Sequence, residues 1–268
     1  MPSPSDYDSD LALAHRLADT ASTIALPLFH QRHLSVRVKS DGSPVTEADR
    51  RVEAGLRAEL RNRRPADALV GEELGASGFG CRSWYIDPID GTAAFASGRP
   101  DWRTLIATAD GGRVVVGVID APALHRRWWA SDQTGSWTRS AGDSTATPLA
   151  VTGTSRIDHA KVAVWPPIAR LPETLHQPAT RLLTDTTRAP DAAAAYGCHH
   201  GALLVAAGEL DAFLFVGGGP WDIAAFVPLV EEAGGRFTDA TGGRALHDRT
   251  ALFSNGRLHG QILDYLRI

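Results

Sequence analysis

The pattern of hydrophobic and polar positions predicts two helices near the start of the chain. Apolar residues recur at helical spacing between residues 11 and 24, so we expect a first helix that begins near residue 8. A second helix is expected from Thr46 to about Arg63, because Thr46 is a favourable N-cap and Asp49 follows at the capping-box spacing. Between them, residues 35–39 alternate like a strand.

Short apolar runs predict several strands over the next hundred residues. The run at residues 68–70 ends at Gly71-Glu72-Glu73, and the run at residues 83–86 ends at Asp87. The Gly111-Gly112 pair is typical of a hairpin turn between two apolar runs. The remaining strands expected in this region cover residues 105–108, 114–118, 126–130 and 136–139.

Beyond Pro166-Pro167, short strands are expected to alternate with helices. The pattern predicts a helix at about 199–207, a strand at 212–215 and, after three glycines, a helix at about 221–233. We therefore expect one domain over residues 1–268, with a β-rich first half at about 8–150 and an α/β second half at about 151–268.

Composition narrows the classes of protein that fit. The 268 residues suffice for a substantial core, and the net charge of -4 disfavours a nucleic-acid partner. The two cysteines, Cys81 and Cys198, stand far apart, and the first residues do not resemble a signal peptide. No apolar run is long enough for a membrane span, so we expect a cytoplasmic protein without membrane contact.

The segment from Asp87 to Thr92 carries the strongest chemical signal. Asp87 and Asp90 are three residues apart at the end of a predicted strand, and Pro88 forces the chain to turn between them. Such a turn can direct both carboxylates and the Ile89 carbonyl at one point, a set of hard oxygen ligands suited to Mg²⁺ or Mn²⁺. An Asp-Gly turn without any ligand has the same local sequence.

Three other acidic residues bear on whether that motif is a metal site or only a turn. Glu72 ends another predicted strand, and Asp222 lies in the first turn of a late helix, where a carboxylate also suits the helix dipole. Asp49, in the second helix, is equally consistent with a simple capping role. Lys39 is as consistent with a solvated strand end as with a place near the acidic residues.

Taken together, the motifs resemble the inositol monophosphatase family. The resemblance covers most of the chain and implies an α/β (α+β) fold, an alternating αβαβα layered sandwich of the inositol monophosphatase/fructose-1,6-bisphosphatase type. It also implies a phosphoric monoester hydrolase that needs Mg²⁺. The matching pieces, in family order, are residues 44–49, 71–73, 86–92 with Phe95, 221–225 and 232–235.

The resemblance also implies roles for individual residues. Two or three Mg²⁺ ions, or Mn²⁺, would be held by Glu72, Asp87, the Ile89 carbonyl, Asp90 and Asp222. Glu72 and Thr92 would activate a water molecule, with Asp49 supporting Thr92. The N–H groups of Gly91 and Thr92 would hold the phosphate, near Asp222. Family members are commonly dimers, so a homodimer is expected by analogy.

Within the family, the chain is similar to the histidinol-phosphate phosphatases. Residues 117–130 and the segment from Ala195 to Gly197 carry that similarity and place Tyr196 near the substrate. Four positions depart from the family pattern: Ala93-Ala94 replaces Lys-Asn, Cys198 replaces an acidic residue, and Phe215 replaces a glutamate. An apolar ring cannot bind a hydroxyl or an ammonium group as a carboxylate does. A small-molecule phosphate ester is therefore expected, either histidinol- or inositol-phosphate-like or a non-standard metabolite, sugar or nucleotide phosphate.

Three rival hypotheses stay open from the sequence. In haloacid-dehalogenase-like phosphatases the nucleophilic aspartate stands two residues before the position of Asp90, where this chain has Pro88. A non-catalytic binding protein that keeps the fold would have no use for a complete set of buried carboxylates. A zinc site at His199-His200 lacks a third ligand at regular spacing.

Overall fold

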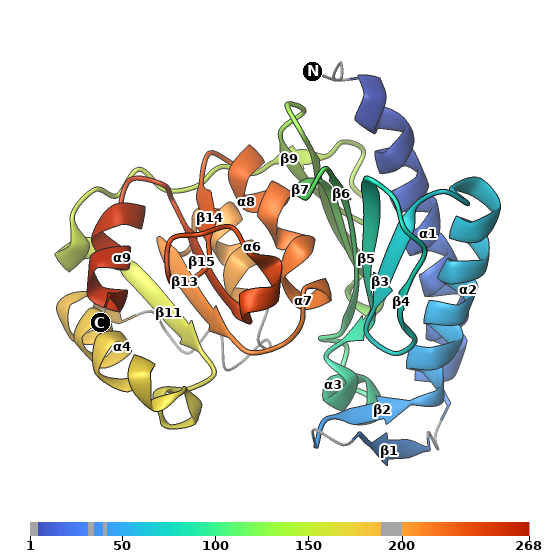
Figure 1. Ribbon diagram of the computed structural model, residues 1–268, viewed down its shortest axis with the longest axis horizontal. Coiled ribbons are helices and arrows are strands. Elements are labelled where there is room, and N and C mark those ends of the chain that lie inside the picture. The colour runs from blue at the N-terminus through green and yellow to red at the C-terminus, as the bar shows by residue number, and fades with distance from the viewer. Residues whose placement is uncertain (1–4, 32–34, 40–41, 189–199, 268) are drawn as a thin grey trace.

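The computed structural model describes residues 5–31, 35–39, 42–188 and 200–267, which form five alternating layers. From right to left in Figure 1 these are two long helices, an eight-stranded sheet, a middle layer of helices, a five-stranded sheet and an outer pair of helices. This arrangement confirms the predicted αβαβα sandwich. The expectation that it folds as one domain stays a prediction.

The first layer consists of α1 (Ser5–Phe29) and α2 (Glu47–Arg63), which bury their apolar faces against the large sheet. The predicted capping box is confirmed. The Thr46 N–H donates to Asp49 Oδ2 at 2.8 Å, and the Ala48 N–H donates to Thr46 Oγ1 at 3.1 Å. A small ribbon of β1 (Val36–Val38) and β2 (Pro44–Thr46) leads into α2.

The eight-stranded sheet has the order β10-β9-β8-β7-β6-β5-β3-β4. Its strands pair antiparallel except β3 and β5, which run parallel and therefore end at the same edge. The predicted hairpin at Gly111-Gly112 joins β6 to β7. The strands are β3 (Ala68–Gly71), β4 (Gly75–Ser77), β5 (Arg82–Asp90), β6 (Arg103–Asp110), β7 (Arg113–Ala121), β8 (Arg126–Ser131), β9 (Ser136–Ser140) and β10 (Thr147–Pro148).

The second half of the chain forms the other three layers. Between the two sheets lie α6 (His200–Ala206), α7 (Trp221–Ala224) and α8 (Phe226–Glu232). The outer layer is α4 (Glu173–Asp185) with α9 (His259–Leu266). The five-stranded sheet has the order β12-β11-β13-β15-β14 and consists of β11 (Lys161–Trp165), β12 (Thr187–Arg188), β13 (Ala212–Val216), β14 (Arg236–Thr238) and β15 (Thr250–Ser254).

Short helices complete the described chain. The five-residue α3 (Thr92–Ala96) follows β5 directly. The 3₁₀ turns are Pro122–Leu124, Ile157–His159, Ile168–Arg170 and Leu246–Asp248. Within the described ranges, no helix combines the length and apolar character needed to cross a membrane.

The prediction of a single helix at about 221–233 is wrong, because the structure divides this segment into α7 and α8 at Ala225. Pro228 accounts for the break. It has no N–H to donate to the Ala224 carbonyl, and its ring occupies the space that this carbonyl needs in a continuous helix. Asp222 consequently lies on a four-residue helix of its own.

The junction between α7 and α8 packs backbone against the large sheet. Gly117 on β7 faces the Ala225 carbonyl, and a Cβ atom at Gly117 would lie 2.2 Å from that oxygen. Only glycine permits such a close approach. The contact therefore sets the spacing between the sheet and the helix pair that carries Asp222.

Candidate active site

A bulge at the end of β5 orients the two motif aspartates. Asp87 pairs with Leu105 of β6, whereas Asp90 pairs with Arg103, so one residue is extra on β5. The strand was expected to end at Asp87; it continues to Asp90 because Pro88, which has no N–H for the ladder, is accommodated at the bulge. The Asp87 carboxylate accepts the Ile89 N–H at 2.9 Å, which fixes the turn.

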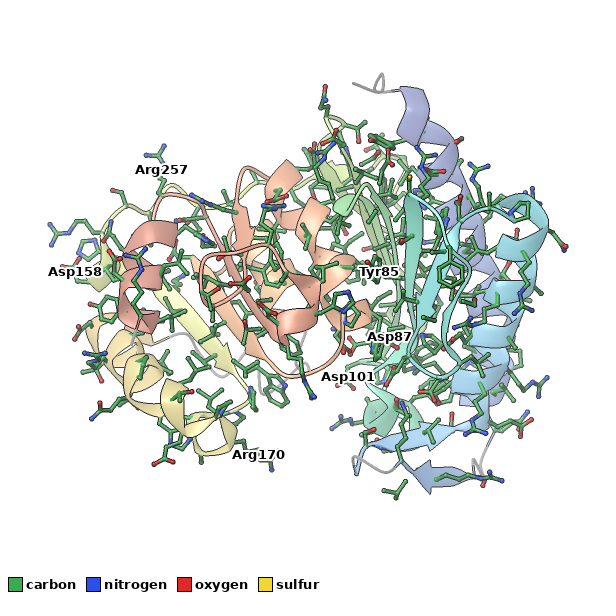
Figure 2. All side chains as sticks on the ribbon, in the orientation of Figure 1. Tyr85, Asp87, Asp101, Asp158, Arg170 and Arg257 are labelled. Atoms are coloured by element: carbon green, nitrogen blue, oxygen red, sulfur yellow. The ribbon has the colours of Figure 1, made fainter. Side chains whose placement is uncertain are left out.

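Asp222 completes a carboxylate cluster with these two residues. One ligand oxygen from each of Asp87, Asp90 and Asp222 lies within 4.8 Å of the others. Figure 2 shows Asp87 at the lower end of the large sheet, on the side that faces the second half of the molecule. Asp90 is also 3.4 Å from Arg103 Nη1, and both side chains are buried.

The Asp87 pKa is raised well above its ordinary value. Burial is the largest cause, and the negative charges of Glu72, Asp90 and Asp222 add to it. Burial likewise raises the pKa of Glu72 to about 7; a hydrogen bond from Lys39 opposes this shift, and the charge of Asp222 adds to it. The cluster thus concentrates more negative charge than its own surroundings neutralise.

Lys39 bridges the two glutamates at the end of β3. Its Nζ lies 2.7 Å from Glu72 Oε1 and also contacts Glu73 Oε1. Burial lowers the Lys39 pKa, but the hydrogen bonds to both glutamates outweigh it and raise this pKa above its usual range. Lys39 is therefore a fixed neighbour of the acidic site and not a solvated strand end.

Thr92, at the start of α3, links the motif to α2. Its hydroxyl Oγ1 lies 3.1 Å from Asp49 Oδ1 and 3.1 Å from the Ile89 carbonyl. Asp49 is fully buried, and its other oxygen accepts the Thr46 hydroxyl at 2.6 Å. Burial raises the Asp49 pKa, although hydrogen bonds from Thr46 and Thr92 oppose the shift.

The position of Asp222 depends on the glycine-rich segment before α7. The Gly219 N–H donates to Asp222 Oδ2. Gly218 has a φ of +66°, and a Cβ atom there would lie 2.3 Å from the same oxygen. Gly218 therefore suits this position both for its left-handed backbone and for the space it leaves.

A cavity of about 210 Å³ joins these groups. The residues that the sequence predicted in the site and that line this cavity are Glu72, Asp87, Ile89, Asp90, Gly91, Thr92, Phe215 and Asp222. Sequence reasoning did not assign Trp165, Pro166, Val216 and Gly218 to the site, although the Pro-Pro and triple-glycine segments signalled irregular backbone there. Tyr196, Cys198 and His199 lie outside the described residues.

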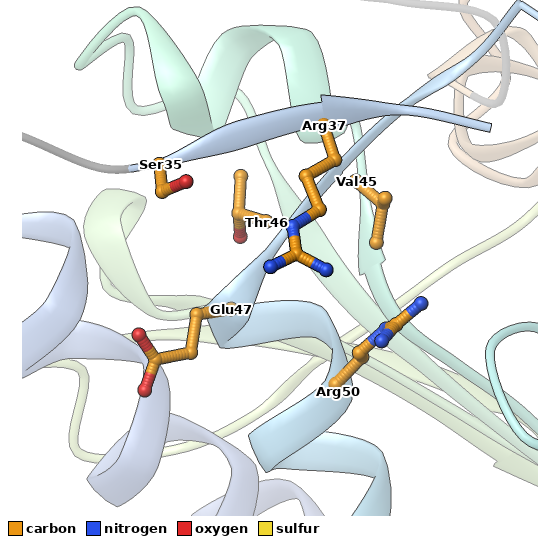
Figure 3. A pocket seen from close by; sticks show the side chains of 6 residues that line it. All are labelled: Ser35, Arg37, Val45, Thr46, Glu47 and Arg50. Atoms are coloured by element: carbon orange, nitrogen blue, oxygen red, sulfur yellow. The ribbon is translucent and has the colours of Figure 1, made fainter.

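Another cavity, of about 240 Å³, lies between the β1–β2 ribbon and the start of α2 (Figure 3). In Figure 3, the Arg37 side chain points from β1 toward the start of α2. The described residues that line it include none of those expected in the active site. The volume of a cavity alone therefore does not locate the chemistry.

The donor set fits divalent cations. Carboxylate oxygens and a peptide carbonyl are the ligands that Mg²⁺ and Mn²⁺ prefer, and Asp87 is buried among like charges that a cation would neutralise. Two cationic side chains contact the acidic residues: Lys39 pairs with Glu72, and Arg103 pairs with Asp90.

Comparisons with known proteins show relatives that match nearly the whole chain. A histidinol-phosphatase from Streptomyces coelicolor is 40% identical over 97% of this chain and 98% of its own. A histidinol-phosphatase from Mycobacterium tuberculosis is 38% identical over 96% and 97%. The structure of an inositol monophosphatase from Zymomonas mobilis matches with a TM-score of 0.80 and 29% identity, and covers 98% of this chain and 99% of that one.

Fold, site and relatives together define a metal-dependent phosphomonoesterase. More specifically, the family model described as "Inositol monophosphatase family" matches residues 6–268, and the chain belongs to that family. Membership implies a divalent metal and a small-molecule phosphate ester as substrate.

Proposed function

We propose that this protein hydrolyses a small-molecule phosphate monoester by direct attack of water, with Glu72 and Thr92 as the groups that activate the water. The observation that carries the proposal is the convergence of Glu72, Asp87, Asp90 and Asp222 on one cavity, beside the Thr92–Asp49 pair. These groups come from four separate segments of the chain, so a chance turn motif does not account for them.

Metal binding is assigned to the acidic side of the cavity. Glu72, Asp87 and the Ile89 carbonyl would hold one ion, Asp87, Asp90 and Asp222 a second, and Glu72 would share a third. When bound, Mg²⁺ or Mn²⁺ lowers the pKa of a coordinated water and neutralises charge on the phosphate and the leaving oxygen.

The protein's own groups orient the water and accept its proton. The Thr92 hydroxyl has two acceptors at 3.1 Å, Asp49 Oδ1 and the Ile89 carbonyl. With the Ile89 carbonyl used as a metal ligand, the hydroxyl proton would go to Asp49 and a lone pair would be left to accept a hydrogen bond from water. The Glu72 carboxylate, with a pKa raised to about 7 before any cation is bound, is the base on the same side of the cavity. Gly91 and Thr92 N–H groups at the start of α3 are proposed to hold the phosphate oxygens.

The identity of the substrate depends on the residues of the site that depart from the family pattern. Relatives named histidinol-phosphatases make histidinol phosphate the first candidate. A relative named inositol-1-monophosphatase makes inositol phosphate the second. Phe215 and Ala93-Ala94, with Cys198 and Tyr196 in the sequence, favour a non-standard ester instead, because a buried ring offers no partner for a hydroxyl or ammonium group.

Phosphate release from a panel of esters with Mg²⁺ tests the proposal. Wild-type protein is expected to release phosphate, and Asp90→Asn to lose that activity while keeping its circular-dichroism spectrum. Retained activity in Asp90→Asn would contradict the assigned metal ligands. Histidinol or inositol phosphate as the clearly best substrate would contradict the non-standard ester.

Two rival classes have their own tests. A non-catalytic binding protein would bind a phosphate ester and release no phosphate from any member of the panel. A haloacid-dehalogenase-like enzyme would form an aspartyl-phosphate that hydroxylamine or borohydride traps; activity without a trapped adduct excludes it. We further propose a homodimer, by analogy with the family, which sedimentation velocity would test.

A further inference from the structure

The cavity at the active site has two chemically different sides. The four carboxylates, with Ile89, Gly91 and Thr92, belong to the first side. The second side is lined by Trp165, Pro166, Phe215, Val216 and Gly218. Among the described residues that line the second side, none carries a charge or a polar side-chain group except the indole N–H.

The arrangement of strands explains why the aromatic rings face the cavity together. Trp165 and Phe215 are Cα partners at the carboxyl ends of the parallel strands β11 and β13. Paired residues on neighbouring strands project from the same face of a sheet. Phe215 is only 3% exposed, whereas Trp165 is half-buried and packs against the same core, so the Trp165 ring is the part of this pair that a ligand can reach.

The glycine segment adds no polar side chain to this side. Gly217 and Gly218 follow Phe215 and Val216, and Gly218 cannot carry a side chain without displacing Asp222. A hydroxyl-rich or positively charged leaving group would therefore lose hydrogen bonds with water and find no side-chain acceptor among the described residues that line this side. A flat apolar group would lose nothing and would gain contact with the indole ring.

We infer that the preferred substrate is the phosphate monoester of a small alcohol whose leaving group carries one uncharged aromatic ring, and that Trp165 determines this specificity by stacking on the ring. The inference rests on the proposed phosphatase function and deepens it. The cavity volume of about 210 Å³, below the roughly 300–1,000 Å³ of pockets for drug-sized ligands, favours a small leaving group.

Three esters of primary alcohols distinguish leaving groups of similar chemical reactivity: 2-phenylethyl phosphate, glycerol 3-phosphate and histidinol phosphate. With Mg²⁺, kcat/KM is expected to be highest for 2-phenylethyl phosphate. Trp165→Ala should lower kcat/KM for that ester about threefold to tenfold, mainly through KM, and change the value for glycerol 3-phosphate less than about twofold. Trp165→Phe should restore most of the loss.

Trp137→Ala is the matched control, because Trp137 is a half-buried tryptophan on β9, which pairs with β8 and β10, away from the cavity. It should leave all three kcat/KM values unchanged. Equal losses for every ester in Trp165→Ala, or a clear preference for glycerol 3-phosphate or histidinol phosphate, overturn the inference and leave the phosphatase intact. No Mg²⁺-dependent phosphate release from any ester overturns the proposed function itself.

Discussion

Glu53 and Arg57 lie one turn apart on the inner face of α2, and both side chains are buried. Arg57 Nε donates to Glu53 Oε1 at 2.7 Å. The same carboxylate accepts the N–H groups of Glu73 at 2.7 Å and of Leu74 at 3.1 Å. Glu53 therefore holds the chain directly after Glu72, a proposed metal ligand.

Arg57 holds the far side of the same turn. Its Nη1 donates to Ser77 Oγ at 3.0 Å, and its Nη2 donates to the Gly75 carbonyl. The buried pair and its four contacts thus fix residues 73–77, which are the end of the turn after β3 and the strand β4, against α2. Neither Glu53 nor Arg57 lines the cavity, so the pair acts on the site through the position of Glu72.

Glu53→Gln tests this role because the amide keeps the size of the side chain and removes its charge. The substitution leaves the Arg57 charge buried without a counter-ion, which costs about 3–5 kcal/mol of unfolding free energy in comparable cases. Displacement of a residue that orients a metal ligand costs about 10- to 100-fold in metal affinity or activity. For Glu53→Gln we expect both effects, a lower unfolding free energy and a lower Mg²⁺ affinity, each of the size given above.

Urea unfolding and isothermal titration with Mg²⁺ measure the two effects separately. Glu53→Gln with Arg57→Met removes both charges and should recover most of the stability but not the metal affinity, because the amide offers one acceptor oxygen to a turn whose two N–H groups each had their own. Glu47 and Arg51 form the matched control on the same helix: this pair has the same spacing, is exposed, and should cost less than about 1 kcal/mol when Glu47 becomes Gln.

Two results would refute the reasoning. A loss in Glu53→Gln no larger than in Glu47→Gln would show that the buried pair contributes no more than an exposed one. Unchanged Mg²⁺ affinity in a folded Glu53→Gln protein would show that Glu72 keeps its place without the pair.

The remaining predictions concern the metal centre and one buried histidine. Mg²⁺ at roughly a hundred times its dissociation constant should stabilise the wild type by about 2.7 kcal/mol, and Asp90→Asn much less; equal stabilisation in a thermal melt contradicts this. Gly218→Ala should lower Mg²⁺ affinity and activity at least about tenfold because its methyl group displaces Asp222, whereas exposed Gly142, also at positive φ but with nothing within 4 Å, should accept alanine with unchanged activity. His259, whose pKa is lowered to about 4 by burial and by Arg236 and Arg244, should lose up to about 3 kcal/mol of its stabilising contribution as pH falls from 6.5 to 4.

The sign of the histidine effect follows from the lowered pKa. Above about pH 6.5 the imidazole is neutral in both states and its contribution is complete; below that pH the unfolded chain binds a proton before the folded one does. His15 has a pKa lowered to about 4 for the same first reason, burial, so the wild type alone does not isolate His259. Unfolding free energies of His259→Gln should fall less steeply over this range, and a parallel decline would contradict the assignment.

The parts of the molecule that the sequence predicted depend on local signals. Thr46 and Asp49 specify a helix start within four residues, and Gly111-Gly112 specifies a hairpin within two. The Asp87–Thr92 segment was recognisable because its ligands lie so close together in the chain. Asp222 could be assigned to the same site only through the resemblance of the chain to a family, because 132 residues separate it from Asp90 in the sequence.

The parts that the sequence did not predict depend on distant contacts. Glu53 and Arg57 have the i,i+4 spacing of an ordinary surface pair, and only the fold reveals that α2 buries them. Trp165 and Phe215 are fifty residues apart, and β11 and β13 bring them together. Pro228, which causes the helix break at Ala225, was visible in the sequence, but the apolar pattern on both sides of the proline concealed the break.

Gly117 has a consequence for how this site can evolve. The distance between the motif aspartates and Asp222 is set where main-chain atoms meet, at Gly117 and the Ala225 carbonyl. Side chains elsewhere in the surrounding core can exchange for others of similar volume without altering that separation. The catalytic centre can therefore tolerate volume-conserving substitutions in the surrounding core. Gly117, although far from any proposed ligand in the sequence, cannot be replaced without moving Asp222 away from the motif aspartates.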